Sequence, residues 1–295
     1  NNNGLLQFDG SFWNLYYMPD SSKLVRSVLC VGDTIFTGSF DEFGYFLHDP
    51  QNGLKYHSLM PLLDKKVSDI DEVWRIYNVG RKIIFQSYTS VMVFEGGHLT
   101  TLTPPEILQF SFLIGDRYYV QGKSGNIYLF NNNQFTPFND GGTFKGIQVW
   151  SVLRIDSEKY LFATINHGVW LFRSGRFTRW TNEANTFLKR NQIFSASAIP
   201  GGYFAFGTIQ DGLIITKENG DVVQYVNKEK GLQNNTVLAT FVDINHNLWL
   251  GLDNGIDYLE LNSSISYYNE GLGLLGACYA VNIFNSKLYV GTNQG

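Results

Sequence analysis

The side chains of this chain that could do chemistry lie beside a recurring glycine and are acids, amides, cations and aromatic rings. Carboxylates and amides can hydrogen-bond hydroxyl groups, and an aromatic ring can stack on the apolar face of a ligand. Such a set suits a neutral or polar oligosaccharide, or another small molecule. The candidate ligand-binding residues are Asp41, Glu42, Trp74, Tyr88, Lys123, Trp150, Asn166, His167, Trp180, Arg190, Asp211 and Asn254.

A purely structural interpretation of the same residues is also open. Asp, Asn and Gly before an apolar strand are what tight turns require, whatever the ligand. Trp249 occupies an aromatic position that recurs along the chain, so we expect it to pack inside the fold. Trp180 differs because it ends a predicted strand and enters a polar loop. We therefore expect Trp180 to contact ligand and to be replaceable with little change in stability.

The chain has no familiar catalytic or metal-binding motif. The five histidines show no His-x-x-x-His spacing, and the two cysteines form no Cys-x-x-Cys pair. Phosphate-binding loops and the Gly-x-Ser-x-Gly elbow are absent as well. We therefore predict no catalytic residue, no metal and no cofactor, and we do not expect this domain to be an enzyme. Distant segments could still assemble a catalytic site, so an enzyme remains an alternative.

The elements that must position the candidate residues are short strands in a repeated unit. An aromatic residue precedes a glycine by six positions in several copies, and these glycines or their equivalents recur about every 35 to 46 residues. Strands of alternating pattern, bounded by Gly, Asn, Asp and Ser, flank each one. Four strands in a unit of this length are typical of a β-propeller blade. The anchors are Gly4, Gly44, Ser90, Gly125, Gly168, Gly212, Gly255 and Gly295.

The spacing of these anchors predicts an all-β fold, a seven-bladed β-propeller that forms a single domain over residues 1–295. The last unit lacks its outer strand pair, and residues 5–17 supply one. We therefore expect the two termini to share one blade with residues 278–292 and to close the ring, which would remove free sheet edges. The chain starts within a unit and without Met, so we expect a fragment of a longer protein.

Composition excludes two classes of partner. The net charge is −4, and Lys and Arg are scattered without a basic stripe, so we expect no nucleic-acid binding. No apolar run is long enough to span a bilayer, so we expect no membrane insertion by this domain. Aromatic residues make up 16% of the chain and are expected to fill the space between blades. Cys30 and Cys278 are expected to be free core residues, although a disulfide between them remains open.

Residues 243–256, with the sequence DINHNLWLGLDNGI, resemble the repeat of two-component-regulator propellers, which reads roughly Asp-x-x-Gly-Asn-Leu-Trp-Ile-Gly-Thr-x-x-Gly-Leu. His246 replaces the first glycine of that pattern, and Leu252 replaces the threonine. Partial copies occur in three other units. Members of this family are periplasmic sensor domains of hybrid histidine kinases and membrane-bound transcription regulators, many of which respond to glycan fragments. The motif is structural, so the resemblance assigns no binding residue.

The resemblance implies a periplasmic, ligand-sensing domain of a receptor that controls transcription, with a carbohydrate fragment as its ligand. It also allows a homodimer formed through the full receptor. Two alternatives stay open: a protein–protein scaffold or dimerisation propeller, and a lyase-like enzyme. In a propeller, the turns between second and third strands and the loops between blades share one face. We therefore expect one group of side chains to converge there: Asp41, Lys123, His167, Trp180 and Asp211.

Overall fold

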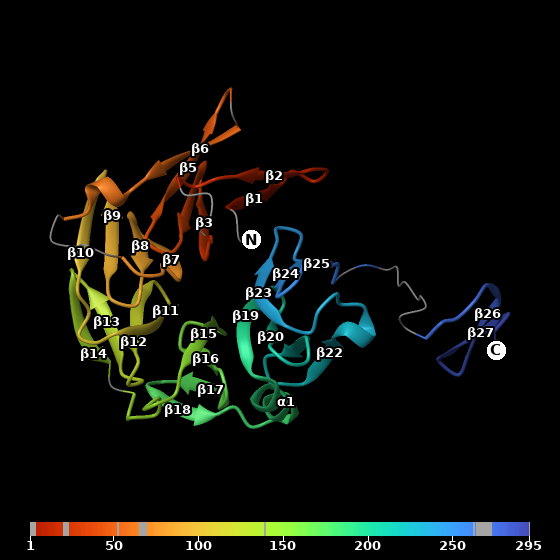
Figure 1. Cartoon of the computed structure of the whole chain (residues 1–295). Coiled ribbons are helices and arrows are strands. Elements are labelled where there is room, and N and C mark those ends of the chain that lie inside the picture. Colours follow the sequence, from red (N-terminus) through yellow and green to blue (C-terminus); the bar gives the residue numbers. More distant parts are fainter. Residues whose placement is uncertain are drawn as a thin grey trace. The chain divides into compact units, whose positions relative to one another are not determined.

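The fold is given by a computed structural model of the chain, which describes residues 4–19, 24–51, 53–64, 70–138, 140–261, 263 and 273–294. The chain divides into two compact units, Asn1–Val152 and Leu153–Gly295. Nearly all regular structure in both units is β (Figure 1), as predicted. Each described sheet joins strands that follow one another in the sequence and run antiparallel.

The first unit holds one hairpin and three four-stranded sheets. The hairpin pairs β1 (Leu5–Phe8) with β2 (Trp13–Tyr16). The three sheets are β3 (Ser27–Val31), β4 (Thr34–Gly38), β5 (Phe43–Asp49) and β6 (Gly53–Ser58); β7 (Arg75–Val79), β8 (Lys82–Gln86), β9 (Val91–Glu95) and β10 (His98–Leu102); and β11 (Leu108–Ile114), β12 (Arg117–Gly122), β13 (Ile127–Asn131) and β14 (Gln134–Phe138). A 3-10 helix, η1 (Met60–Leu62), follows β6.

The second unit begins within β15 (Val149–Arg154), the first strand of its first sheet. That sheet continues with β16 (Lys159–Thr164), β17 (Gly168–Arg173) and β18 (Arg176–Arg179), and the helix α1 (Glu183–Asn191) follows. The next four-stranded sheet is β19 (Ile193–Ile199), β20 (Tyr203–Thr208), β21 (Leu213–Lys217) and β22 (Val222–Val226), and the 3-10 helix η2 (Lys228–Lys230) follows it. A three-stranded sheet is formed by β23 (Val237–Val242), β24 (Leu248–Leu252) and β25 (Ile256–Leu259). The last element is the hairpin of β26 (Cys278–Phe284) and β27 (Lys287–Thr292).

The predicted number of blades is wrong, because the structure has six blades and not seven. Five sheets have four strands and one has three. Residues 5–17 and 278–292 were expected to share a seventh blade, but β1–β2 and β26–β27 are separate two-stranded sheets in the part of the chain that is described. Among the described anchors, Gly125, Gly168, Gly212 and Gly255 have a positive φ and lie at or beside a turn, whereas Gly44 lies within β5. Local turn chemistry, however, does not encode which hairpins pair across a long sequence separation, so the count of anchors exceeded the count of blades.

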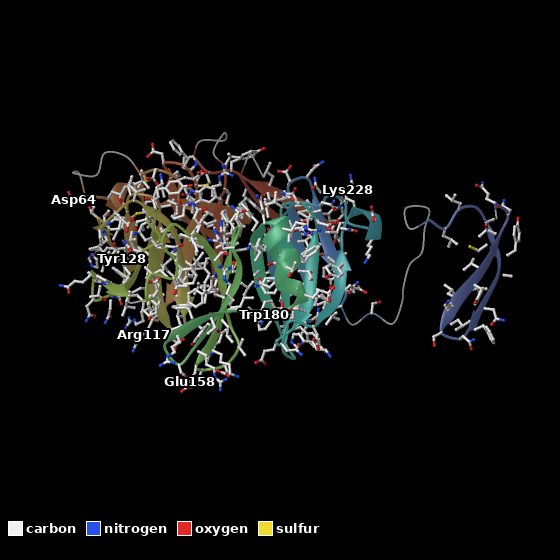
Figure 2. All side chains as sticks on the ribbon, turned by 90° about the horizontal axis from the view of Figure 1, so that it is seen from below. Asp64, Arg117, Tyr128, Glu158, Trp180 and Lys228 are labelled. Atoms are coloured by element: carbon white, nitrogen blue, oxygen red, sulfur yellow. The ribbon has the colours of Figure 1, made fainter. Side chains whose placement is uncertain are left out.

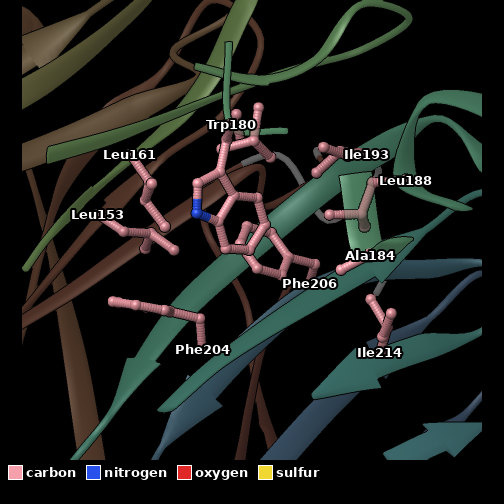
Figure 3. Packing of buried hydrophobic residues seen from close by; sticks show 11 residues of the cluster. Leu153, Leu161, Trp180, Ala184, Leu188, Ile193, Phe204, Phe206 and Ile214 are labelled. Carbon is pink, nitrogen blue, oxygen red and sulfur yellow. The ribbon is translucent and has the colours of Figure 1, made fainter. Parts of the chain in front are cut away.

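The core of each unit lies between neighbouring blades. In the first unit Phe36 and Phe43 of one blade pack with Phe85 of the next, at ring-centroid distances of 6.1 and 4.8 Å. In the second unit Leu161 and Phe206, from the β15–β18 and β19–β22 blades, belong to one buried cluster (Figure 3). Such contacts arise because alternate residues of each strand point to the same sheet face.

The recurring aromatic position is a packing position in three of its copies. Tyr119, Phe162 and Phe206 are buried, as the structural interpretation predicted. Trp249 is half-buried and lies 4.7 Å from the ring of Tyr258. The copy at Tyr289 differs: it lies in β27 with 54% of its surface exposed. In Figure 2 the side chains of the β26–β27 hairpin (dark blue) project from both of its faces, and every residue of β26 is exposed.

The two cysteines are free and exposed, so the expectation that they lie in the core is wrong. Cys30 lies in β3, where alternate residues point away from the packed face, and Cys278 lies in β26, where every residue is exposed. Among the described residues, no helix has the length and apolar character needed to cross a membrane.

Candidate functional site

In the first unit, backbone hydrogen bonds join the turn between second and third strands of each blade to the loop that enters the next blade. The Val73 amide donates to the Ser39 carbonyl at 2.9 Å, and the Leu108 amide donates to the Tyr88 carbonyl at 2.7 Å. The Gly146 amide likewise donates to the Ser124 carbonyl at 2.9 Å. The predicted turn residues of this unit therefore lie at one end of its blades.

The second unit repeats this arrangement. The Ile193 amide donates to the Ile165 carbonyl at 3.1 Å, and the Gly212 amide donates to the Asn235 carbonyl at 2.8 Å. His167 and Asp211 belong to the turns that these bonds fasten. The predicted convergence of Asp41, Lys123, His167, Trp180 and Asp211 extends over both units and stays a prediction.

At this end of the first unit, the structure brings two predicted residues together in what we call the Trp74 cluster: Arg26, Asp71, Glu72, Trp74 and Tyr88. The rings of Trp74 and Tyr88 meet edge to face, 5.8 Å between centroids, and both are half-buried. The Arg26 guanidinium lies 5.3 Å from the centre of the Trp74 ring and pairs with Glu72.

The carboxylates of the Trp74 cluster have defined roles. Asp71 accepts hydrogen bonds from the Tyr88 amide and the Thr89 hydroxyl, both at 2.8 Å, and so fixes the turn that carries Tyr88. Burial raises the pKa of Tyr88, and the charges of Glu72 and Asp71 raise it further. The Tyr88 hydroxyl is therefore protonated at neutral pH and available as a donor. The cluster thus combines aromatic surface with hydroxyl, carboxylate and guanidinium groups.

The other predicted residues of the first unit are divided between structural and exposed positions. Glu42 is buried, and its Oε1 accepts from the Ser58 hydroxyl at 2.7 Å and the Tyr56 hydroxyl at 3.1 Å. Asp41 has a φ of 53°, and its Oδ1 accepts from the Ile70 amide at 3.3 Å. Lys123 is exposed, whereas the half-buried Trp150 packs on Phe110 at 4.1 Å. Glu42 is therefore a structural residue of the turn.

The second unit has an open cavity of about 620 Å³ beside α1, which we call the Arg179 cavity. It contains two of the predicted residues, His167 and Arg190, and six that were not in the predicted set. Its lining residues are His167, Arg179, Thr181, Asn182, Asn185, Thr186, Lys189 and Arg190.

The helix α1 forms one wall of the Arg179 cavity because two asparagines fasten it. Asn182 caps the helix: its Oδ1 accepts from the Asn185 amide at 2.8 Å. The Asn185 side chain accepts from the Val169 amide at 2.6 Å and donates to the Val169 carbonyl at 3.3 Å. Gly168 has a φ of 72°, and a Cβ there would collide with Asn185. The turn and the helix can approach closely only because residue 168 is glycine.

Arg179 is held in place by two contacts. Its Nη1 donates to the His167 carbonyl at 3.1 Å, and its guanidinium lies 4.3 Å from the centre of the Trp170 ring. Trp170 and Arg179 are direct cross-strand partners in β17 and β18. The sequence prediction missed Arg179 and Lys189 because it considered only turns and loops. Cross-strand register would have pointed to Arg179.

Trp180 does not lie in the Arg179 cavity, and the expectation that it is an exposed platform is wrong. Only 6% of its surface is exposed, and its ring lies 5.9 Å from that of Phe206 (Figure 3). The polar loop that follows it forms α1, whose apolar face, with Ala184 and Leu188, belongs to the same buried cluster. A strand-ending tryptophan is therefore covered by the next element.

The remaining predicted residues of the second unit do not line the Arg179 cavity. Asn166 and Asn254 are exposed. Asp211 is half-buried, its amide donates to the Thr208 hydroxyl at 3.1 Å, and its Oδ1 accepts from Asn227 at 2.9 Å. No group of three or more potential metal-ligating side chains occurs in the described parts of the chain.

The segment that carries the family resemblance is a fastened turn. The Asp243 carboxylate accepts from the amides of Asn247 and Asn245, both at 2.9 Å, and from the Trp249 indole at 3.2 Å. His246, which replaces a glycine of the repeat, has a φ of 64° in the left-handed region that favours glycine. The aspartate and tryptophan of the motif therefore support each other, in agreement with a structural role.

No family model and no curated protein matches the sequence. Solved structures do match. Two structures of the extracellular domain of BT4673 from B. thetaiotaomicron, described in one case as a one-component system and in the other as a hybrid two-component system, are 18% and 17% identical to this chain, with TM-scores of 0.68 and 0.69. The alignments cover 89% and 98% of this chain, but only 36% and 40% of those domains. The chain thus spans less than half the length of these relatives.

Other propellers are similar as well. Streptogramin B lyase is 12% identical, with a TM-score of 0.66 and coverage of 88% of this chain and 87% of the lyase. The WD40 β-propeller domain of Doa1 is 13% identical, also with a TM-score of 0.66, and the match covers 87% of this chain and 84% of that domain. At these identities the likeness shows the β-propeller fold alone. The two BT4673 structures support the resemblance to two-component-regulator propellers.

Proposed function

We propose that this chain is a ligand-sensing, extracytoplasmic domain of a signal-transduction receptor. The observation that carries the proposal is its likeness, over 89% and 98% of its length, to extracellular domains of one-component and hybrid two-component systems. The resemblance of residues 243–256 to two-component-regulator repeats supports the same conclusion. We further propose that the domain lies in the periplasm and that its ligand controls transcription through the output module of the receptor.

We propose a carbohydrate as the ligand, bound in part at the Trp74 cluster. Sugars present apolar ring faces and many hydroxyl groups, so their sites combine aromatic surface with fixed polar groups. Trp74 and Tyr88 supply the aromatic surface, and Arg26 and Glu72 supply donors and acceptors at the same end of the unit. Lys123 and Asp41 belong to turns at this end and are proposed as further contacts.

Binding of the labelled protein to an array of oligosaccharides tests this proposal. We expect binding to a restricted set of sugars, and a loss of roughly tenfold or more in affinity for Trp74→Leu, which removes the ring but keeps apolar bulk. Trp13→Leu is the matched control because Trp13 is in the same unit, is 48% exposed and lies outside the Trp74 cluster. An equal loss of affinity in both variants would argue against the Trp74 cluster as the binding site.

The alternatives predict different results on the same array. A protein–protein scaffold or dimerisation propeller would bind none of the sugars. A lyase-like enzyme, the activity named for one similar propeller, would cleave a sugar without forming a stable complex. Retained, saturable binding without turnover is the outcome that supports the sensor.

A further inference from the structure

We infer that the second unit has an anion-binding site of its own, and that the carboxylate or sulfate group of an acidic ligand binds in the Arg179 cavity. The inference rests on the proposed sensing function and adds the charge of the ligand and a second binding site. It starts from the composition of the cavity: Arg179, Lys189 and Arg190 are its charged lining residues, and all three are cations. The candidate residues in the sequence suited a neutral or polar sugar, whereas this lining favours an acidic one.

The three cations have no anionic partner among the described residues. The ion pairs among the described residues involve none of Arg179, Lys189 and Arg190, although the chain as a whole carries a net charge of −4. Cations that face one cavity repel one another, and an anion bound between them relieves this repulsion. Glu183 lies at the start of α1, but it is not part of the lining. The cavity therefore favours a negative ligand.

Arg179 is oriented for anion binding before any ligand arrives. Its ring contact with Trp170 and its bond to the His167 carbonyl fix the guanidinium plane. That bond uses only Nη1, and a guanidinium has further N–H groups that can grip a carboxylate or a sulfate with two parallel hydrogen bonds. Lys189 and Arg190, from the last turn of α1, add two exposed charges to the same cavity. One oriented guanidinium and two exposed cations suit an anion attached to a larger molecule.

The neutral lining residues fit a sugar as the carrier of this anion. Asn182 and Asn185 are occupied in fastening α1. Thr181 and Thr186 offer hydroxyl groups, and His167 offers an imidazole. The volume of about 620 Å³ lies within the range of small-molecule sites. An acidic sugar would place its anion among the cations and its hydroxyl groups against the threonines.

The test is isothermal titration calorimetry with matched pairs of sugars that differ only in the anion. Digalacturonic acid is compared with its neutral dimethyl ester, and sulfated lactose with lactose, so that the two pairs distinguish a carboxylate from a sulfate. We expect at least one acidic member to bind roughly tenfold or more tightly than its neutral partner. Its affinity should also fall as salt is raised.

Variants locate the anion in the Arg179 cavity. Arg179→Lys keeps the charge but loses the two parallel hydrogen bonds of a guanidinium, and Lys189→Gln with Arg190→Gln removes two exposed charges. Both variants should lower the affinity for the acidic sugar roughly tenfold and leave the affinity for its neutral partner unchanged. Arg176→Gln is the control, because Arg176 is exposed in the same strand, β18, and lies outside the lining.

Each outcome decides the inference. Equal affinity for acidic and neutral partners, or no binding of either acidic sugar, would overturn it. An unchanged affinity in both cavity variants would also overturn it, even if acidic sugars bind. If only neutral sugars bind on the array, the inferred anion site is contradicted, but the proposed sensing function is still supported. If the array shows no sugar binding at all, the proposed function itself fails, and the two failures can be told apart.

Discussion

At the scale of single residues, Trp180 shows how burial changes the meaning of a position. The side chain is 6% exposed and packs among Leu153, Leu161 and Phe206. We predict that Trp180→Ala lowers the free energy of unfolding by about 3–5 kcal/mol, because it leaves a large cavity. Urea unfolding measures this. Trp13→Ala, at a 48% exposed position, should cost less than about 1 kcal/mol. Equal costs for the two variants would contradict the assignment of Trp180 to the core.

Asp243 makes the stability of the second unit depend on pH. Hydrogen bonds from the Asn247 amide, and then from the Trp249 indole and the Asn245 amide, hold the pKa of its carboxyl below the usual range. An aspartate with a lowered folded-state pKa contributes stability above its unfolded pKa of about 3.9, and this contribution is lost as pH falls through the folded value.

We therefore predict that Asp243→Asn is less stable than the parent at pH 7 and that the difference shrinks below about pH 4. Urea unfolding of both proteins at pH 7 and pH 3 checks this prediction. Asp33→Asn, at an exposed aspartate in the turn between β3 and β4, serves as the reference for a general charge effect. A difference that grows on acidification would contradict the assigned role of Asp243.

The candidate site could be predicted only in part from single residues. The position of His167 before a glycine anchor placed it in a second-to-third-strand turn, and Arg190 was placed in the loop that follows. Arg179 was missed because it lies in a strand, where its partner Trp170 is set by register and not by a local motif. Glu42 and Trp180 were misjudged because burial by a neighbouring element leaves no trace in the local sequence.

At the scale of elements, the helix α1 connects stability to the proposed anion site. Its N-cap Asn182 satisfies the Asn185 amide, and its last turn carries Lys189 and Arg190. We predict that Asn182→Ala costs about 0.5–2 kcal/mol of unfolding free energy and also weakens binding of an acidic sugar. Chemical unfolding and calorimetry check the two effects. Asn182→Ser can still cap the helix and should restore both; failure of serine to do so would argue against the capping role.

The strands themselves were largely predictable, and the helix was not. Alternating apolar residues between turn residues gave the positions of most strands, because a half-buried strand imposes that pattern. The sequence allowed a short helical turn only at residues 69–73 and 185–190. Residue 69 lies outside the described residues, residues 70–73 form no helix, and α1 is Glu183–Asn191. Its N-cap signal, Asn182 followed by Glu183, is common to loops and helices. Docking on the turn at Gly168 is what selects the helix, and that contact comes from tertiary structure.

At the scale of the whole molecule, the count of six blades has a direct consequence. Every residue of β26 is exposed, so the β26–β27 hairpin contributes little to folding. We predict that a protein ending at Leu261 stays soluble and melts in one transition within about 2 °C of the full chain. Differential scanning calorimetry checks this. Loss of solubility, or a large fall in melting temperature, would show that the hairpin is needed to complete a blade.

The central claim is that this propeller binds a ligand at the end of its blades where second-to-third-strand turns meet the loops between blades. Hydrogen–deuterium exchange, measured by mass spectrometry with and without the sugar that binds best, tests it most directly. Within the first unit we predict slower exchange in the turn that carries Tyr88, and within the second unit, for an acidic sugar, in the turn at His167 and in α1; the outer strands β10 and β25 should be unchanged. Protection confined to the outer strands, or no protection with any sugar, would contradict the account.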